Sequence, residues 1–296
     1  MVPASPRASS DPAAPVASAV AARQCLAAAG AFHGRLEVAF LALHGGVGED
    51  GTVQALLEAV GFPYTGSGQA ASAIAMDKSL TKMVMQAIGV PTPAWTLVAP
   101  AAYLEKLAGT PVGGLPVVVK PKKEGSSVGV TIVTEPEGWE PALRAAEGSD
   151  EQLLVERYVP GRELTVGVLD GRVLPVVEIV PREGFYDYGN KYGEGRTTYE
   201  VPARIPEAVE RVIKDDAGRL FAALGCRGMA RVDFRLPADG LAQCLELNTI
   251  PGLTGTSLLP KAAQAAGIGF AEMLETICRA GIRDHRVPPP PPSGVL

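Results

Sequence analysis

The chain has few of the residues from which metal and disulfide sites are built. Its 296 residues include 3 histidines and 4 cysteines, and no two cysteines form a CxxC pair. So few histidines, with no HExxH motif, exclude zinc-protease chemistry. Scattered cysteines in a chain of this length predict reduced core residues of a cytoplasmic protein, not a disulfide framework.

The chain also lacks a basic excess and a long apolar run. Its 27 Lys and Arg residues and 32 Asp and Glu residues give a net charge of −5, which argues against a general nucleic-acid binder. No apolar run approaches the ~18 residues of a membrane span, so we expect no membrane partner. What is present, 47% apolar and 20% charged residues, is typical of a soluble globular protein with a sizeable core. The length favours two compact units.

The two ends differ from the rest of the chain. Residues 1–35 are rich in Ala, Pro and Ser and predict a low-complexity segment with a disordered start. An Ala-rich helix over 15–29 is expected. A secretory signal is the alternative, disfavoured because Arg23 and Gln24 interrupt the apolar run and no basic start precedes it. Residues 284–296 form a proline-rich tail, which predicts a solvated extension.

Between the ends, predicted helices alternate with predicted hairpins. Strands are expected over residues 36–43, 116–121, 128–133, 152–159, 163–169, 173–180, 229–236 and 241–248. Helices are expected over residues 52–60, 70–88, 136–146, 206–224, 257–266 and 270–280. Asp170 and Gly171 form a hairpin turn, and residues 183–199 a polar, Gly-rich loop. Helices mixed with antiparallel hairpins predict a mixed α/β (α+β) fold and not a parallel wound sheet.

Two familiar motifs occur in contexts that do not support them. GSGQAA (66–71) fits the dinucleotide pattern GxGxxA, but it lacks a clean strand before it and an acidic residue about 20 positions later. It is better explained as a turn before a helix. GSSVG (125–129) fits the GxSxG pattern of serine hydrolases. A β-branched strand follows it, and the only later histidine is His285, beside the proline-rich tail, so we disfavour a hydrolase.

The same segment is better explained as a phosphate-binding loop. Lys120 ends a buried strand, small residues follow over 125–127, and the chain then returns as a strand. Small residues let backbone N–H groups approach phosphate oxygens, and a lysine adds a point charge. On this segment alone, a surface hairpin with a solvated lysine pair is an equal alternative.

Three oxygen-bearing side chains lie on two neighbouring predicted strands. Glu246 and Asn248 are two positions apart and share one face, and Asp233 lies on the partner strand. Such hard oxygen ligands suit Mg²⁺ with bound phosphate. Two like charges 4 Å apart cost about 4 kcal/mol at an effective dielectric of 20, so phosphate binding here needs a cation. A solvent-facing acidic edge is the alternative, but the apolar neighbours on the strand favour burial, and a buried carboxylate needs a partner.

Arg231 lies on the same face as Asp233, two positions before it. Two interpretations remain open from the residues alone. The guanidinium is either the structural counter-ion of Asp233 or a group that stabilises an oxyanion.

Seven segments in a fixed order resemble one known family. They read LALHGGVGEDGTVQALLEAVGFPYTGSG, MDKSLTKMV, VKPKKEGSSVGV, LLVERYVPGRELTV, FYDYGNKY, RVDF and LELNTIPGLTGTSL. Over residues 37–283 the chain is thereby similar to D-alanine–D-alanine ligases of the ATP-grasp superfamily. The resemblance implies an ATP-grasp domain over 77–283, with the nucleotide between two sheet-containing subdomains. It also implies a shortened N-terminal α/β domain over 36–76, a cytoplasmic location and a homodimer.

The resemblance further implies a role for each matching residue. ATP phosphates would contact Lys78, Lys120 and Lys191, the adenine Glu156, Arg157 and Val159, and the ribose Glu163. Two Mg²⁺ ions, with Mn²⁺ as a possible substitute, would bind Asp233, Glu246 and Asn248. An oxyanion would be held by Arg231 and the N–H of Gly252, and the second substrate's carboxylate by Ser257 and the N–H of Leu258. Ser126 and Tyr192 would meet across the site, and His44 would lie near the second substrate's amine.

In isolation, several of these residues have simpler explanations. Lys78 fits a solvated helix lysine, Glu163 an edge-strand charge and His44 a group that caps a loop. Tyr186 and Tyr192 fit loop aromatics that pack on the surface. The joint pattern favours the functional roles.

The implied activity is ATP-dependent joining of two D-alanines through an acyl phosphate, which gives D-alanyl-D-alanine for peptidoglycan synthesis. The resemblance also implies that the tyrosine at position 192 goes with an amine acceptor and not with D-lactate. The family's usual opening, GGxSxExxxS, is not found in residues 1–35. Two alternatives therefore accompany this hypothesis: an ATP-grasp carboxylate–amine ligase with another first substrate, and a truncated, catalytically impaired paralogue that still binds ATP.

Overall fold

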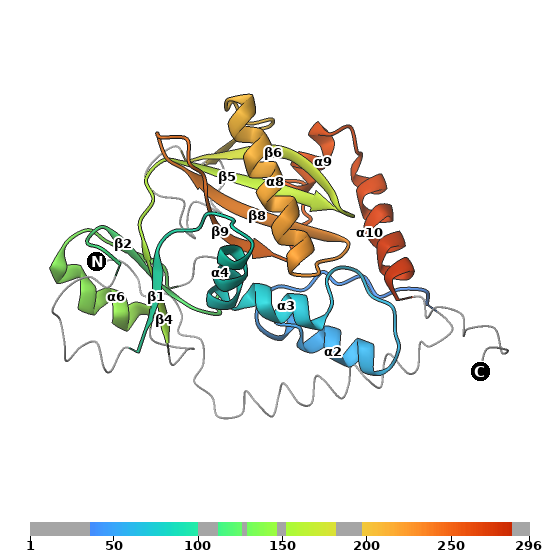
Figure 1. Ribbon diagram of the computed structural model, residues 1–296. Coiled ribbons are helices and arrows are strands. Elements are labelled where there is room, and N and C mark those ends of the chain that lie inside the picture. The colour runs from blue at the N-terminus through green and yellow to red at the C-terminus, as the bar shows by residue number, and fades with distance from the viewer. Residues whose placement is uncertain (1–35, 100–111, 126–128, 147–151, 182–196, 286–296) are drawn as a thin grey trace, which may run out of the picture.

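The computed structural model describes residues 36–99, 112–125, 129–146, 152–181 and 197–285 (Figure 1). The predictions for residues 1–35, for most of the loop over 183–199 and for nearly all of the proline-rich tail lie outside these residues. Across the described ranges, no helix combines the length and the apolar character needed to cross a membrane.

The first described segment is not the strand that its sequence predicts. Within residues 36–43 only Ala39 makes a ladder contact, an isolated parallel bridge to Tyr64. Phe40 and Leu43 are exposed. A strand needs a row of backbone partners, and the described part of the chain offers this segment one bridge only. The Gly-rich stretch that follows contains a short 3₁₀ turn, η1 (Gly46–Gly48), and then the predicted helix α2 (Thr52–Ala59).

The predicted helix over residues 70–88 is in fact two helices. They are α3 (Gln69–Met76) and α4 (Lys78–Ala87), separated by Asp77 in an extended conformation. The Asp77 carboxylate accepts hydrogen bonds from the backbone N–H groups of Ser79 (3.0 Å) and Leu80 (3.3 Å). An aspartate that bonds the backbone in this way competes with a continuous helix and favours a new N-terminus. Asp77 therefore fixes where α4 begins.

A four-stranded antiparallel sheet carries the phosphate-loop segment. Its order is β1-β4-β2-β3, from β1 (Trp95–Val98), β4 (Leu153–Arg157), β2 (Val117–Pro121) and β3 (Thr131–Val133). Strand β1 was not predicted from the sequence. A 3₁₀ turn, η2 (Pro136–Gly138), leads into helix α6 (Trp139–Ala146), which packs on the face lined by Val117, Val119 and Val155. Because side chains alternate along a strand, Lys120 and Glu156 lie on the opposite face.

A five-stranded antiparallel sheet carries the predicted metal ligands. Its order is β7-β6-β5-β8-β9, from β7 (Thr197–Glu200), β6 (Arg172–Pro181), β5 (Arg162–Leu169), β8 (Met229–Leu236) and β9 (Gln243–Asn248). The predicted hairpin turn is confirmed, since Asp170 (φ 48°) and Gly171 (φ 79°) join β5 to β6. The predicted pairing of β8 with β9 is confirmed as well.

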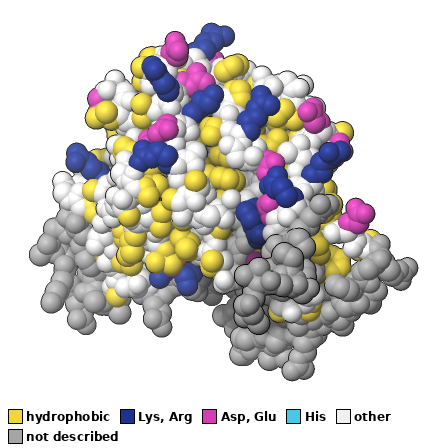
Figure 2. Space-filling view, turned by 45° about the vertical axis from the view of Figure 1, so that its right-hand side comes forward, with side chains coloured by type: hydrophobic (Ala, Val, Ile, Leu, Met, Phe, Trp, Pro, Cys, Tyr) yellow, Lys and Arg dark blue, Asp and Glu magenta, His cyan; other side chains and the backbone are white. Residues whose placement is uncertain are grey.

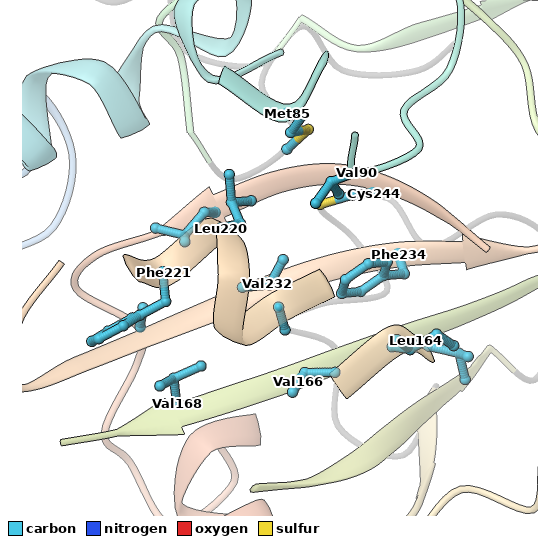
Figure 3. Packing of buried hydrophobic residues seen from close by; sticks show 14 of the residues in the cluster. Met85, Val90, Leu164, Val166, Val168, Leu220, Phe221, Val232, Phe234 and Cys244 are labelled. Carbon is cyan, nitrogen blue, oxygen red and sulfur yellow. The ribbon is translucent and has the colours of Figure 1, made fainter. Parts of the chain in front are cut away.

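Helices cover both faces of the five-stranded sheet (Figure 1). Helix α8 (Glu207–Ala223) lies on one face, and α9 (Leu258–Ala265) and α10 (Phe270–Asp284) lie on the other. Met85 of α4 joins the α8 side, where Leu220 and Val232 are fully buried (Figure 3). Each such side chain contributes about 1.5–3 kcal/mol relative to exposure. This core fixes α4 against β9, next to the candidate site.

The surface carries charges of both signs. On the face shown in Figure 2, basic and acidic side chains are interspersed over the upper part, and hydrophobic side chains gather lower down. This mixture agrees with the small net charge of −5.

Candidate active site

Helix α4 places two buried lysines between the sheets. Lys78 and Lys82 are four residues apart and therefore lie on one side of the helix. Lys78 Nζ donates a hydrogen bond to the Glu124 carbonyl (2.5 Å) and lies 3.8 Å from Glu246 Oε2. Lys78 is only 8% exposed, so the solvated-lysine explanation is wrong. The helix thus connects the phosphate-loop segment to strand β9.

Glu156 is buried between two lysines. Its Oε1 lies 2.6 Å from Lys82 Nζ, and its Oε2 lies 2.7 Å from Lys120 Nζ. Burial alone would raise the pKa of Glu156, but Lys120 and Lys82 together lower it, so the side chain is a carboxylate. Burial lowers the pKa of Lys78 and of Lys82. The three groups Lys82, Glu156 and Lys120 hold two positive charges and one negative charge.

The predicted metal ligands share one face of β8 and β9. The strand register places Asp233 opposite Glu246, and Arg231 opposite Asn248. Arg231 forms a bidentate ion pair with Asp233, with Nε 2.9 Å from Oδ1 and Nη2 2.8 Å from Oδ2. Thr165 Oγ1 donates to the same Oδ1 at 2.6 Å. The prediction that Arg231 and Asp233 share a face is confirmed, and the counter-ion interpretation has direct support.

The donor chemistry of this face fits a magnesium ion. The protein offers two carboxylates and one amide oxygen, from Asp233, Glu246 and Asn248, at neighbouring register positions. Within the described ranges, no group of three or more His, Cys, Asp and Glu side chains is arranged to hold a metal. Mg²⁺ typically takes one or two carboxylates and completes its shell with water and substrate phosphates, so a small donor set is what it needs.

Residues 249–257 connect β9 to α9. Ser257 precedes the first helical residue, Leu258, and its Oγ bonds the Thr254 N–H (3.1 Å) and the Thr254 hydroxyl (2.8 Å). A Cβ on Gly252 would lie 2.8 Å from Ser257 Oγ, so any other residue at that position would displace the Ser257 hydroxyl. N–H groups at a helix N-terminus attract anions, which makes this turn suitable for a carboxylate.

An arginine that the motifs did not single out holds the linker between the two sheets. Arg235 Nε donates to the Val159 carbonyl and its Nη1 to Glu163 Oε2, both at 3.2 Å. Glu163 is therefore part of an ion pair and not an isolated edge charge. Arg157 is exposed, and its backbone N–H donates to the Ala94 carbonyl (2.8 Å). The adenine and ribose roles of these residues stay predictions.

His44 and Glu49 lie together in the Gly-rich segment after residue 43. His44 Nδ1 is 3.7 Å from Glu49 Oε2, which also accepts a hydrogen bond from the Gly45 N–H (2.7 Å). The His44 side chain is 65% exposed, whereas Glu49 is buried. Glu49 was not predicted as a site residue, although it lies within the Gly-rich motif that follows residue 43. Ser126, Tyr186, Lys191 and Tyr192 lie outside the described residues, so their roles stay predictions.

Two antiparallel sheets, one with the buried Lys120 and one with oxygen donors, and a helix with two buried lysines between them are typical of the ATP-grasp class of fold, as the motifs predicted. Solved structures agree. A D-alanine–D-alanine ligase from Bacillus anthracis complexed with ATP is 37% identical, with a TM-score of 0.71 over 84% of this chain and 80% of its own. A D-Ala:D-Ser ligase from Enterococcus faecalis is 32% identical, with a TM-score of 0.74 over 83% and 73%.

Sequence comparisons identify the family within this class. The model described as "D-ala D-ala ligase C-terminus" matches residues 84–279, and that described as "D-ala D-ala ligase N-terminus" matches residues 6–67. The D-alanine–D-alanine ligase of Syntrophotalea carbinolica is 49% identical over 242 residues, which cover 82% of this chain and 78% of the relative. The chain belongs to the D-alanine–D-alanine ligase family. The N-terminal match extends into the segment interpreted above as low complexity.

Proposed function

We propose that this protein joins two D-alanines in an ATP-dependent reaction that serves peptidoglycan synthesis. The observation that carries the proposal is the position of Lys78. Its ammonium contacts both the carbonyl of Glu124 in the phosphate-loop segment and the carboxylate of Glu246 on β9. A phosphate-binding charge and a metal-type carboxylate are thereby adjacent, which is what phosphoryl transfer to a carboxylate requires. The names of the relatives support the substrate, and the ATP-bound Bacillus anthracis structure supports ATP.

Asp233, Glu246 and Asn248 would hold Mg²⁺, as two ions, with Mn²⁺ as a substitute. When bound, the metal neutralises phosphate charge during the transfer. Lys78 and Lys120 supply the protein's own positive charge toward the phosphates, and their burial makes that charge more effective than it would be in water.

The remaining residues serve the second half of the reaction. The first D-alanine's carboxylate takes the γ-phosphoryl group, and the second D-alanine's amine then displaces phosphate from the acyl carbon. The oxyanion that forms on the way would be held by Arg231 and the Gly252 N–H. Asp233 fixes the Arg231 guanidinium by two hydrogen bonds, and such preorganisation is what stabilises an oxyanion effectively. Ser257 and the N-terminus of α9 would receive the second D-alanine's carboxylate.

The direct test is ADP release from purified protein with ATP, Mg²⁺ and D-alanine, with the product identified by mass spectrometry. We expect D-alanine-dependent ADP release and a D-alanyl-D-alanine mass, and no product from L-alanine. D-Lactate and D-serine, each added with D-alanine, test the choice of acceptor. Folded protein that binds ATP but releases no ADP with D-alanine would contradict the proposal.

A ligase with a different first or second substrate is the second candidate. The likeness to a D-Ala:D-Ser ligase favours it. A panel of D-amino acids with a preference other than D-alanine would support it, whereas ATP binding without any product would support the impaired paralogue. Homodimer assembly also remains a proposal, which light scattering tests.

A further inference from the structure

Lys82 is the most deeply buried lysine near the site, yet the family resemblance implies no role for it. Its side chain is 0% exposed. A lysine removed from water needs partners for its charge and its donors. Besides the ion pair with Glu156, Lys82 Nζ donates to Thr92 Oγ1 (2.6 Å). It therefore does not act as a solvated surface charge.

Thr92 extends this contact to the second sheet. The Thr92 hydroxyl donates to the Cys244 carbonyl (2.8 Å), and the Cys244 N–H donates to the Pro91 carbonyl (2.8 Å). Cys244 lies on β9, two residues before Glu246, whereas Glu156 lies on β4 of the other sheet. Lys82 thus connects the strand next to Lys120 with the strand that carries the metal-type ligands.

Lys82 also affects the electric charge that Lys120 presents to a phosphate. Glu156 contacts Lys82 with one oxygen and Lys120 with the other. Without Lys82, the carboxylate would be left with Lys120 as its near partner and would cancel the charge that Lys120 offers to a phosphate. With Lys82 present, the three groups keep a net positive charge of one beside the phosphate-loop segment.

We propose that Lys82 is a positioning residue for the nucleotide phosphates. It takes up part of the Glu156 charge so that Lys120 stays positive toward the phosphate, and through Thr92 it sets the spacing between β4 and β9. The inference rests on the proposed use of ATP and deepens it, because it assigns part of the phosphate affinity to a group that does not reach the nucleotide.

The experiment measures the Kd of ATP with Mg²⁺ by calorimetry, together with KM for ATP and for D-alanine. Lys82→Met keeps the length of the side chain and removes its charge. We expect it to raise Kd and KM for ATP about tenfold, the loss typical of a charge-assisted contact. KM for D-alanine should change less than about twofold, within ordinary additivity error. Lys82→Arg should recover most of the ATP affinity, and Thr92→Val should show a smaller loss of the same kind.

Two controls separate this role from a general loss of structure. Lys214→Met removes a partly exposed lysine of α8, 3.8 Å from Glu210, and should leave all three constants unchanged. Thermal unfolding of every variant checks folding. If Lys82→Met does not fold, Lys82→Met combined with Glu156→Gln removes both charges and is compared with Glu156→Gln alone. In that background the loss of Lys82 should raise the ATP Kd less than it does in the wild type, since no carboxylate remains to cancel Lys120 and only the contact with Thr92 is lost.

Three results would overturn the proposal. The first is that Lys82→Met loses the same ATP affinity in the wild-type and the Glu156→Gln backgrounds. The second is that Lys82→Met raises KM for ATP and KM for D-alanine equally. The third is that the wild-type protein binds no ATP. The third also ends the proposed function. Wild-type protein that binds ATP but forms no dipeptide ends the proposed function alone, because the affinity comparison still decides the role of Lys82.

Discussion

The two sheets treat their charged side chains differently. On the four-stranded sheet, Glu156 is 2% exposed and Lys120 6%, and each is held by a fixed ion pair. On the five-stranded sheet, the side chains of Asp233 and Glu246 are 16% and 34% exposed. A buried charge is costly unless it is paired, whereas a partly exposed one can exchange water for a ligand. The first sheet therefore holds its charges in fully buried pairs, whereas the second leaves its carboxylates partly accessible to water, as a site that binds ligands requires.

The largest expected effect concerns the buried ion pairs of Glu156 on the four-stranded sheet. Glu156→Ala should destabilise the fold by about 3–5 kcal/mol, because it leaves Lys82 and Lys120 buried without their common partner. Urea unfolding at pH 7 measures the free energy of unfolding. Glu246→Ala is the matched variant on the other sheet, and it should cost about 1 kcal/mol or less, since Lys78 keeps its hydrogen bond to Glu124. Equal losses in the two variants would remove the distinction between the sheets.

The next effect concerns activity on the five-stranded sheet. Arg231→Ala should lower kcat by about 10²–10³, the usual loss when one oxyanion donor is removed. ADP release measures kcat, and urea unfolding checks that the fold is kept. Arg144→Ala, on the exposed face of α6, should leave kcat unchanged and cost no more than about 0.5 kcal/mol of stability, through loss of its exposed ion pair with Glu140. An Arg231→Ala enzyme with near-normal kcat but reduced stability would show that Arg231 serves only as the counter-ion of Asp233.

A smaller effect tests how α4 is held between the sheets. Asp77→Ala should cost about 0.5–2 kcal/mol through loss of the helix cap. Burial alone would raise the pKa of the Asp77 carboxyl, but hydrogen bonds from Ser79 and Leu80 and the nearby Lys122 lower it overall. The pKa is thus lower in the folded state, so this contribution is present above the unfolded value of about 3.9 and is lost as pH falls below it.

Urea unfolding of the wild type and the variant at pH 7, 5, 4 and 3 measures this change. The difference in the free energy of unfolding should shrink below about pH 4. Asp77→Asn, which also caps a helix well, should keep most of the stability at pH 7. A difference that stays constant down to pH 3 would refute the assignment to Asp77.

The smallest expected effect concerns an exposed ion pair on α6, which serves as a reference for the buried pairs. Glu140 and Arg144 of α6 form an exposed pair at 2.6 Å, with side chains 52% and 62% exposed. Glu140→Ala should cost about 0.3–0.5 kcal/mol, and less at high salt. Urea unfolding at low and high salt measures it. A loss close to that of Glu156→Ala would mean that burial does not set the value of an ion pair in this protein.

Local patterns predicted the elements whose partners are near in sequence. Alternation along β8 and β9 predicted one face with Arg231, Asp233, Glu246 and Asn248, because the period of a strand fixes that face before any tertiary contact forms. The break at Asp77 was missed, since an aspartate inside a helical pattern reveals its capping role only when its hydrogen bonds are known. Strand β1 was missed because its four residues pair with β4, which is distant in sequence.

The contacts of Lys82 and Arg235 could not be predicted from the sequence either. Lys82 repeats Lys78 at helical spacing, which is a signal, but its partner Glu156 lies on another sheet and only the fold joins them. Arg235 follows Asp233 by two positions and so shares its face. Its hydrogen bond to the Val159 carbonyl, however, depends on where the fold places the linker between β4 and β5 relative to β8. Long-range pairs of this kind leave no periodic pattern.

The shared core of α3 and α4 limits how this chain can be divided. Ala71 and Ala75 of α3 pack in the same buried cluster as Met85 of α4 and Val232 of β8. A predicted boundary at residue 76 therefore passes through a continuous hydrophobic interior. Recombination between relatives at that point would exchange one half of a packed interface without the other, so viable chimaeras should carry residues 69–87 as an indivisible unit together with α8 and the five-stranded sheet.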